Sequence, residues 1–420
     1  MIGIWLSMVR AFNDNYCQAD PSVPSSKDAP EGWALRFAQV VVRHGDRLTT
    51  TTPIMLVNDS VVWNCSLDQL GVPTTQDSQS TVESPARLYR LSYLPGREVY
   101  PGDCHYGQLT VRGAEQHLVL GAELRKAYVD NTKLVAGVDE IWVRSTYVQR
   151  TVNSIQANID GMFPLEGAES DVPVVPVRTM DSQTENMLPN TVACPLLSQL
   201  YTQQNAQPFW SDFISNNVSS TMAQVHALGY LLPYTGTNAL NSFTDTVWPR
   251  ICHALPLPPG VTMPLFEEAW RQNTYYTMNV LWGGATTLPW AIGSFVGELV
   301  QRVSDVVSAG VSAVPAKLML YSGHDATIVP LSNAFFRTAD LKWAPYASHI
   351  EIELWQAPNA SYFIRTSYNG RSFVVPSCSG IFCDVNLWIT SVSWVVPKNY
   401  QQECQQTTVG SINPSAHIFT

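Results

Sequence analysis

The sequence predicts an α/β fold: a three-layer α/β/α sandwich around a mostly parallel central sheet, with an inserted, mostly helical cap subdomain. Two observations predict it. Apolar runs of strand length alternate along the chain with amphipathic helical patterns, which is the order found in α/β proteins. A long stretch near the middle of the chain instead carries proline clusters and aromatic-rich pieces, without a strand of comparable quality. The 420 residues are enough for one large domain with such an insertion.

Three apolar runs are predicted to form buried, parallel strands: residues 34–42, 139–143 and 316–321. They lack the alternation of apolar and polar side chains that marks a strand with one exposed face. A fourth run, residues 349–355, does alternate. We therefore expect this last run to form a half-exposed strand.

Three helical patterns lie between the predicted parallel strands, at residues 108–129, 146–162 and 289–308. In the first, Thr110 is the expected N-cap, and the apolar residues after it recur at helical spacing. We expect this segment to be an amphipathic helix that connects one strand to the next.

These patterns divide the chain into an α/β core of residues 33–180 and 286–404, a cap of residues 181–285, an N-terminal segment and linker of residues 1–32, and a C-terminal tail of residues 405–420. The first nine residues are apolar but have no basic residues before them, so they are a poor secretion signal. A truncated start or a loose N-terminal segment explains them as well. No run of 18 or more apolar residues occurs, so we expect no transmembrane helix.

Charge and cysteine usage argue against several classes of protein. The net charge of −10 has the wrong sign for a broad nucleic-acid-binding surface. None of the eight cysteines forms a CxxC motif, which favours structural disulfides in an oxidising compartment over a zinc site or a thiol redox centre. Four glycosylation sequons are present, about the number that chance predicts, at Asn58, Asn64, Asn217 and Asn359.

Charged side chains follow each of the three predicted parallel strands. Arg43, His44 and Arg47 follow the first strand, Arg144 follows the second, and His324 and Asp325 follow the third. Ligands of open α/β sheets bind beyond the carboxyl ends of the strands, so we expect these side chains to meet in one crevice. Any one of them could simply mark the exit of a strand into solvent. Together, in a chain with only 14% charged residues, they predict a cationic pocket for an anion.

Phosphate is the anion that several guanidinium groups bind best, because their planar donors match its oxygens. A histidine at a strand end can attack phosphorus through a ring nitrogen, and His44 is the candidate nucleophile. Neighbouring guanidinium charges should lower the pKa of His44 and keep its ring neutral. Asp325, next to His324, is the carboxyl group expected to protonate the leaving group. This chemistry requires no metal ion or cofactor.

The same residues resemble the histidine acid phosphatases, branch two of the histidine phosphatase superfamily. The likeness covers residues 36–404 and is nearest to the lysosomal and prostatic type. Four segments carry it in the family's order: RHGDR at residues 43–47, GQLT at 107–110 with Gly113, RST at 144–146 with Arg150, and SGHD at 322–325. The resemblance implies His44 as nucleophile, Asp325 as proton donor, and Arg43, Arg47, Arg144 and His324 as phosphate ligands.

The resemblance also implies two disulfides, Cys194–Cys404 and Cys378–Cys383. Cys65 and Cys104 are expected to form a third. Where the prostatic type has a further cysteine, this chain has His349, so Cys252 is either free or joined to Cys17. The segment after RHGDR differs as well, because Leu48 and four threonines precede Pro53. The C-terminal membrane anchor of the lysosomal type has no counterpart in the sequence.

The expected function is hydrolysis of phosphate monoesters, of small molecules or of phosphoproteins, by a secreted or lysosomal enzyme. Two alternatives remain open at this level. One is a specialised phosphatase for inositol phosphates or lysophospholipids within the same family. The other is a non-catalytic phosphate-binding or surface protein that kept the fold. Related acid phosphatases are often dimers, so a homodimer is expected by analogy alone.

Overall fold

The computed structural model describes residues 16–50, 61–63, 65, 69–70, 89–90, 104–164, 174–230, 234–337 and 342–405. Asn58, Asn64 and Pro53, residues 1–15 of the predicted N-terminal segment and nearly all of the C-terminal tail lie outside these residues. Among the described residues, no helix has both the length and the apolar character needed to span a bilayer.

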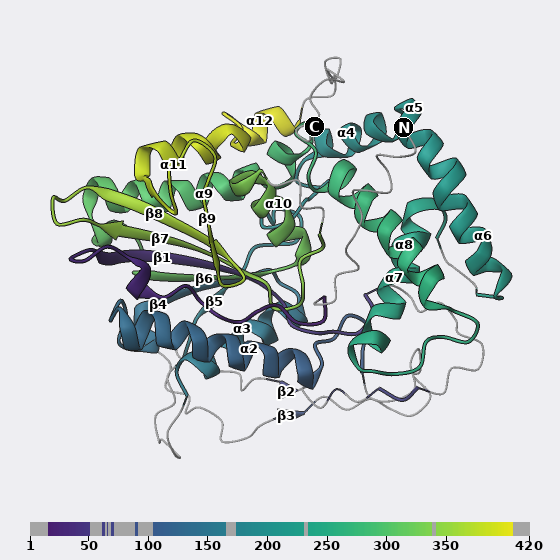
Figure 1. The fold of residues 1–420 in the computed structure, drawn as a ribbon, viewed down its shortest axis with the longest axis horizontal. Helices are drawn as coiled ribbons and strands as arrows, with labels where there is room; N and C mark the ends of the chain where they lie inside the picture. The colour runs from purple at the N-terminus through teal and green to yellow at the C-terminus, as the bar shows by residue number, and fades with distance from the viewer. Residues whose placement is uncertain are drawn as a thin grey trace, which may run out of the picture.

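An eight-stranded mixed sheet with helices on both faces forms the core, which confirms the predicted fold class (Figure 1). Its strand order is β10-β8-β7-β1-β6-β4-β5. The parallel half consists of β1 (Ala34–Arg43), β6 (Leu318–Gly323), β4 (Ile141–Ser145) and β5 (Val177–Arg178). The antiparallel half consists of β7 (His349–Gln356), β8 (Tyr362–Tyr368), β10 (Phe382–Asp384) and β9 (Arg371–Phe373), which pairs with β8 off the main path. A separate short pair joins β2 (Gln69–Leu70) to β3 (Tyr89–Arg90).

The three predicted buried strands are therefore β1, β4 and β6, and they are parallel as expected. The prediction of a half-exposed strand at residues 349–355 is wrong. In β7, His349, Glu351 and Glu353 are at most 1% exposed, although they are polar. The alternation of the sequence reflects two buried faces, one apolar and one lined with ion pairs, rather than one face open to solvent.

Helices α2 (Val111–Leu124) and α3 (Gln149–Met162) cover one face of the sheet, and α9 (Leu288–Ala309), α10 (Asp325–Phe336) and α11 (Val385–Val392) cover the other (Figure 1). The predicted helices correspond to α2, α3 and α9. Thr110 is the N-cap of α2, and its hydroxyl accepts a hydrogen bond from the Gly113 amide at 3.1 Å.

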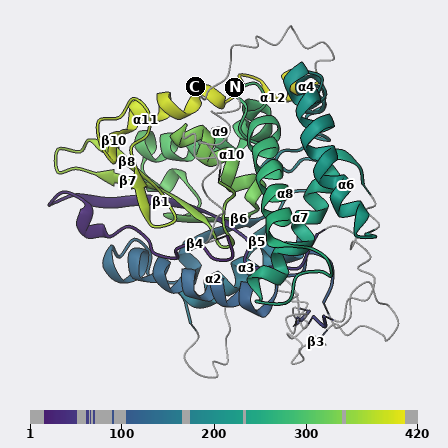
Figure 2. The same cartoon turned by 45° about the vertical axis from the view of Figure 1, so that its right-hand side comes forward.

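The region predicted to be the cap carries five helices and, among its described residues, no strand. These are α4 (Pro195–Asn205), α5 (Pro208–Asp212), α6 (Ser219–Ala227), α7 (Gly236–Cys252) and α8 (Met263–Tyr276). They stand beside the sheet and come forward in Figure 2. One apolar cluster contains Tyr321 of β6, Phe295 of α9 and Phe243 of α7. The cap therefore shares a core with one face of the sheet. A last short helix, α12 (Tyr400–Cys404), closes the described chain.

Two sequons lie among the described residues. Asn359 is exposed between β7 and β8, whereas Asn217 is partly buried in a π-helical turn, Phe213–Val218. Only the first presents its side chain openly to solvent.

Candidate active site

The carboxyl ends of β1 and β6 open into a cavity of about 360 Å³ that the cap helices α7 and α8 close from the other side. Its lining includes five chemically active residues: His44, Arg47, Arg150, His324 and Asp325. The register between β1 and β6 brings the two histidines together. Arg43 pairs with Gly323, and His44 and His324 are the next residues of the two strands' chains. The two imidazole rings lie 5.5 Å apart, centroid to centroid.

Backbone packing below His44 depends on two glycines. A Cβ atom on Gly45 would lie 2.2 Å from the Gly113 carbonyl oxygen, and one on Gly113 would lie 2.2 Å from the Asp46 carbonyl oxygen. Neither contact is tolerable for a larger residue. The first turn of α2 therefore packs directly on the loop that carries His44, which fixes the position of the ring.

His44 has the protonation state of a nucleophile. Its Nδ1 lies 2.8 Å from the Gly45 carbonyl oxygen, which can only accept, so Nδ1 carries the proton and Nε2 has a free lone pair. Burial lowers the pKa of His44 well below its usual value, and the charges of Arg150, Arg43 and Arg47 lower it further. The ring is therefore neutral even in acidic solution.

His324 is held by hydrogen bonds on both ring nitrogens. Arg150 donates from Nη2 to His324 Nδ1 at 3.2 Å, so the ring proton lies on Nε2 and is donated to the Thr146 hydroxyl at 3.0 Å. Thr146 in turn lies 2.9 Å from the hydroxyl of Thr151. Burial, followed by the charge of Arg150, lowers the pKa of His324 well below its usual value. This second imidazole is also neutral.

Three arginines supply the positive charge: Arg43, Arg47 and Arg150. Each has a buried Nε without a hydrogen-bond partner in the described structure, as do Arg144 and Arg302 outside the cavity. Of these five, only Arg47 and Arg150 combine such a donor with a place in the cavity lining, which suits them to bind an anion there. Burial, with a contribution from Arg47, lowers the pKa of Arg150 to about 10, which still leaves it charged at neutral pH.

Arg43 lies behind the pocket wall and is fully buried. Its Nη2 is 3.1 Å from Asp325 Oδ2 and donates to the Tyr16 hydroxyl at 3.0 Å, while Nη1 donates to the Ala344 carbonyl. The guanidinium also lies 4.3 Å from the centre of the Tyr346 ring. Arg43 thus acts on the pocket through Asp325 and through its electric field.

Arg47 faces the cap. Its Nη1 donates to Asp245 Oδ1 of α7 at 2.8 Å, and Asp245 Oδ2 accepts from the Thr49 hydroxyl and the Thr50 amide, each at 2.7 Å. Burial works to raise the pKa of Asp245, but Arg47 and these donors outweigh it and lower the pKa. Sequence reasoning missed Asp245, because it lies in a region interpreted only as a cap.

Arg144 does not reach this pocket, so its predicted place among the phosphate ligands is wrong. It pairs with Glu185 at 2.7 Å and with Glu298 at 2.9 Å, and neither residue lines the cavity. The strand register gives the reason. Arg144 of β4 pairs with Tyr321 of β6, which pairs with Val41 of β1, so Arg144 lies two residues before the level of Arg43 along the sheet. Its side chain lies on the face of the sheet that α9 covers. The other arginine of the same motif, Arg150 in the first turn of α3, occupies the site instead.

Asp325 begins α10, and its carboxylate has three close partners. Oδ2 accepts from Trp343 Nε1 at 2.7 Å and faces Arg43, while Oδ1 accepts from the Ala326 amide at 2.9 Å. Burial alone would raise the pKa of Asp325, but the charges of Arg43 and Arg47 outweigh it and hold this pKa at about 2. Without a bound anion, Asp325 is therefore ionised.

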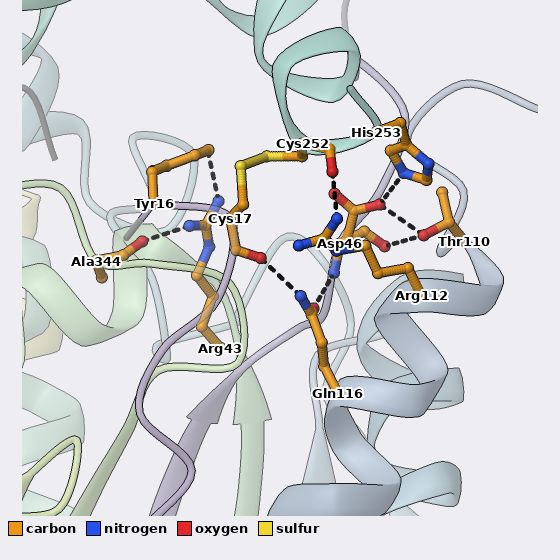
Figure 3. Close-up of a disulfide and its surroundings, with 10 residues drawn as sticks. All are labelled: Tyr16, Cys17, Arg43, Asp46, Thr110, Arg112, Gln116, Cys252, His253 and Ala344. Atoms are coloured by element: carbon orange, nitrogen blue, oxygen red, sulfur yellow. Dashed lines mark hydrogen bonds and ion pairs between the residues drawn. A yellow bond between two sulfur atoms is a disulfide. The ribbon is translucent and has the colours of Figure 1, made fainter. Parts of the chain in front are cut away.

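A disulfide between Cys17 and Cys252 joins the N-terminal segment to the end of α7, which settles the pairing that the sequence left open (Figure 3). Gln116 donates to the Cys17 carbonyl at 2.7 Å and accepts from the Asp46 amide at 2.8 Å. The Asp46 carboxylate accepts from His253 at 2.6 Å. As Figure 3 shows, this network holds Tyr16 against Arg43. Nothing in the sequence marked Tyr16 as part of the site.

The structure also contains the two disulfides that the family resemblance implies, Cys194–Cys404 and Cys378–Cys383, and the third that was expected, Cys65–Cys104. All eight cysteines are thus paired. Among the described residues, no cluster of three or more His, Cys, Asp and Glu side chains could hold a metal ion.

The fold and this site define a class of protein: an α/β enzyme fold with two neutral histidines and unsatisfied arginines at the strand ends, suited to a phosphoryl group. A family model for the histidine phosphatase superfamily (branch 2) matches residues 34–369. The chain belongs to this family.

Relatives and solved structures agree with that assignment. The chain is 32% identical to counting factor 60 of Dictyostelium discoideum over 405 residues, covering 94% of this chain and 93% of that protein. It is 28% identical to the lysosomal acid phosphatase of Bos taurus (80% and 82% covered) and 26% identical to the human lysophosphatidic acid phosphatase type 6 (89% and 87% covered). A Hafnia alvei phytase in complex with myo-inositol hexakis sulphate shares the fold, with a TM-score of 0.58 at 13% identity, covering 90% of this chain and all of that one.

Proposed function

We propose that the protein is an acid phosphatase that hydrolyses phosphate monoesters through a phosphohistidine on His44, with Asp325 as the general acid. One observation carries the proposal: a neutral imidazole presents a free Nε2 in a pocket that is lined by two guanidinium groups with unsatisfied donors, Arg47 and Arg150. The similarity to relatives named lysosomal acid phosphatase and lysophosphatidic acid phosphatase supports it. Four disulfides favour an oxidising compartment, such as the lysosomal lumen or the extracellular space.

In the first step, His44 Nε2 attacks phosphorus, the P–N bond forms, and the bond from phosphorus to the ester oxygen breaks. Arg47 and Arg150 bind the phosphoryl oxygens, and Arg43 adds its charge from behind Asp325. His324 contributes its Nε2 proton to a phosphoryl oxygen only by releasing Thr146, to which it donates in the empty site. The leaving oxygen takes the proton of Asp325. In the second step, Asp325 accepts a proton from water, the resulting oxygen attacks phosphorus, and the P–N bond breaks to release phosphate and neutral His44.

The proton on Asp325 has to arrive with the substrate. The carboxyl group is ionised in the empty site, because its pKa is about 2. A bound phosphate offsets the charges of the arginines that hold the pKa down, so the pKa of Asp325 rises when the pocket is filled. A monoanionic ester carries the proton that Asp325 then takes up, so we expect activity in acid.

Trapping the intermediate tests the proposal. The wild-type protein, mixed with a ³²P-labelled monoester and denatured within milliseconds in alkaline detergent, should retain label in a base-stable bond. His44→Ala should retain none, whereas His226→Ala, at an exposed position in α6, should label like the wild type. Label of wild-type intensity on His44→Ala, or none on the wild type with any monoester, would overturn the proposal.

Asp325→Asn tests the role of the acid. Alkyl phosphates should lose about 10²-fold or more in kcat relative to aryl phosphates, because a phenolate leaves without much protonation. Equal losses on both kinds of ester would place the acid elsewhere. Trapping on His44 should persist in this variant with an aryl ester.

A further inference from the structure

An unbroken row of aromatic rings lines one side of the active-site cavity. Four tryptophans from three segments form it: Trp248, Trp270, Trp282 and Trp343. Their ring centroids are separated by 4.9 Å between Trp248 and Trp270, 4.8 Å between Trp270 and Trp343, and 5.0 Å between Trp343 and Trp282. We call these four residues the indole wall. It was not foreseen from the sequence, and the phosphoryl chemistry does not require it.

The indole wall begins at the general acid. Trp343 donates from Nε1 to Asp325 Oδ2 at 2.7 Å, so this indole touches the carboxyl group that protonates the leaving oxygen. Under the proposed function, the phosphoryl group binds at His44, Arg47 and Arg150. A group attached to the leaving oxygen beside Asp325 then extends along the indole wall.

The rest of the cavity has little to offer a second phosphate. Among its described lining residues, the cations are Arg47 and Arg150, and both belong to the phosphoryl site. The two histidines of the lining belong to that site as well and are neutral. The remaining charged side chains are carboxylates, Asp325 and Asp245, and Asp245 already holds Arg47. The further phosphates of a polyphosphorylated leaving group would lie against indoles and a carboxylate, which do not bind anions.

We infer, on the basis of the proposed function, that the substrates are monoesters whose leaving group is large, apolar and free of further phosphates, and that the indole wall binds this group. The cavity volume of about 360 Å³ exceeds the need of a phosphoryl group and lies within the range of about 300–1,000 Å³ for small-molecule pockets. Either an aromatic ring or an alkyl chain would offer the apolar surface that packs against the indoles. Apolar area buried against the indoles then contributes to transition-state binding.

Matched pairs of esters separate this binding from leaving-group reactivity. Octyl and ethyl phosphate have alcohols of similar acidity, as do 2-naphthyl and phenyl phosphate, but the members of each pair differ in apolar area. Octyl phosphate should exceed ethyl phosphate in kcat/KM by about tenfold, the equivalent of about two buried methylene groups. The aryl pair shows whether rings are preferred to chains. myo-Inositol hexakisphosphate should be turned over more slowly than either apolar ester.

Trp282→Ala and Trp142→Ala form a matched pair of variants, because both indoles are partly buried but only Trp282 lines the cavity. Trp282→Ala should cut the octyl-to-ethyl ratio of kcat/KM toward one, because it removes apolar area that only the octyl chain reaches. Trp142→Ala should leave the ratio intact. An equal loss of the ratio in both variants would mean general loosening and would refute the role of the wall.

The same experiments separate this inference from the proposed function. If phosphate is trapped on His44 but the octyl-to-ethyl ratio is below threefold, or the inositol ester is the better substrate, the inference is wrong and the proposed function stands. If no ester labels His44, both are wrong. A ratio near ten that depends on Trp282 supports the inference.

Discussion

The parallel and antiparallel halves of the central sheet both bury cationic side chains, but they differ in what surrounds these groups. In the antiparallel half, Arg365 donates from Nε to Glu353 at 2.6 Å and from Nη1 and Nη2 to the carbonyls of Ser25 and Pro24. His349 pairs with Glu351 and donates to the Asp20 carbonyl at 2.9 Å. Burial would lower the pKa of His349, but Glu351 outweighs it and raises the pKa.

At the carboxyl ends of the parallel half, the arginines are left with free donors and the histidines stay neutral. Burial is similar in both places, so burial alone does not distinguish a structural charge from a functional one. The difference is that Arg47 and Arg150 combine an unpaired donor with a place in the cavity lining, whereas every donor nitrogen of Arg365 has a partner. We therefore expect substitutions in the antiparallel half to change stability, and those at the strand ends to change activity.

Arg365→Met should have the largest effect and should act on stability. It leaves the Glu353 carboxylate buried without its cation, which costs about 3–5 kcal/mol of the free energy of unfolding. Urea unfolding followed by tryptophan fluorescence measures this, and kcat/KM of the folded protein should be unchanged. Replacing both partners, with Glu353→Leu added, should recover much of the loss. An unchanged urea midpoint in the single variant would break the comparison.

Arg150→Met should show the opposite behaviour. Its guanidinium has an unsatisfied Nε and a pKa lowered by burial, so its removal should not lower the free energy of unfolding. The loss of a phosphate ligand should reduce kcat/KM about 10²-fold. Arg144→Met is the matched control, because that arginine binds Glu185 and Glu298 instead. A larger loss of kcat/KM in Arg144→Met than in Arg150→Met would contradict the assignment.

With an alkyl ester, kcat/KM should fall about tenfold per pH unit above the second pKa of the phosphate group, which is about 6. Above that pKa the substrate no longer carries the proton, and Asp325, with a pKa of about 2, has none of its own. On the acid side the rate should hold until His44 is protonated, and its lowered pKa places that loss well below pH 6.5. Stopped assays from pH 4 to 8 measure this, and a flat profile would contradict the mechanism.

The smallest effect should come from Tyr16→Phe, which removes the hydroxyl that accepts from Arg43 at 3.0 Å. We expect a loss of about fivefold in kcat, equivalent to about 1 kcal/mol for one hydrogen bond. Tyr346→Phe is a matched control on the other side of Arg43, because the Tyr346 hydroxyl has no hydrogen-bond partner in the described structure. Equal losses in the two variants would mean that Tyr16 acts only through packing.

The sequence was enough to predict the fold class, the parallel strands and most of the pocket, because strand ends in a parallel sheet meet at one edge. It was not enough to choose between Arg144 and Arg150. That choice depends on where β4 stops relative to β1 and on which face of the sheet Arg144 occupies, and both are set by register. Tyr16, Asp245 and the indole wall come from segments without a local pattern, so only tertiary structure brings them to the site.

The indoles that border the cavity are also members of the apolar cluster that binds the cap to the sheet: Trp248, Trp270 and Trp343 all belong to it. A substitution at one of these three positions that adapts the cavity to a different leaving group would therefore also change the stability of the fold. Trp282 packs only at the margin of that cluster. In laboratory evolution toward new esters, substitutions should therefore appear first at residue 282. Substitutions of Trp248, Trp270 or Trp343 should require stabilising changes elsewhere in the chain.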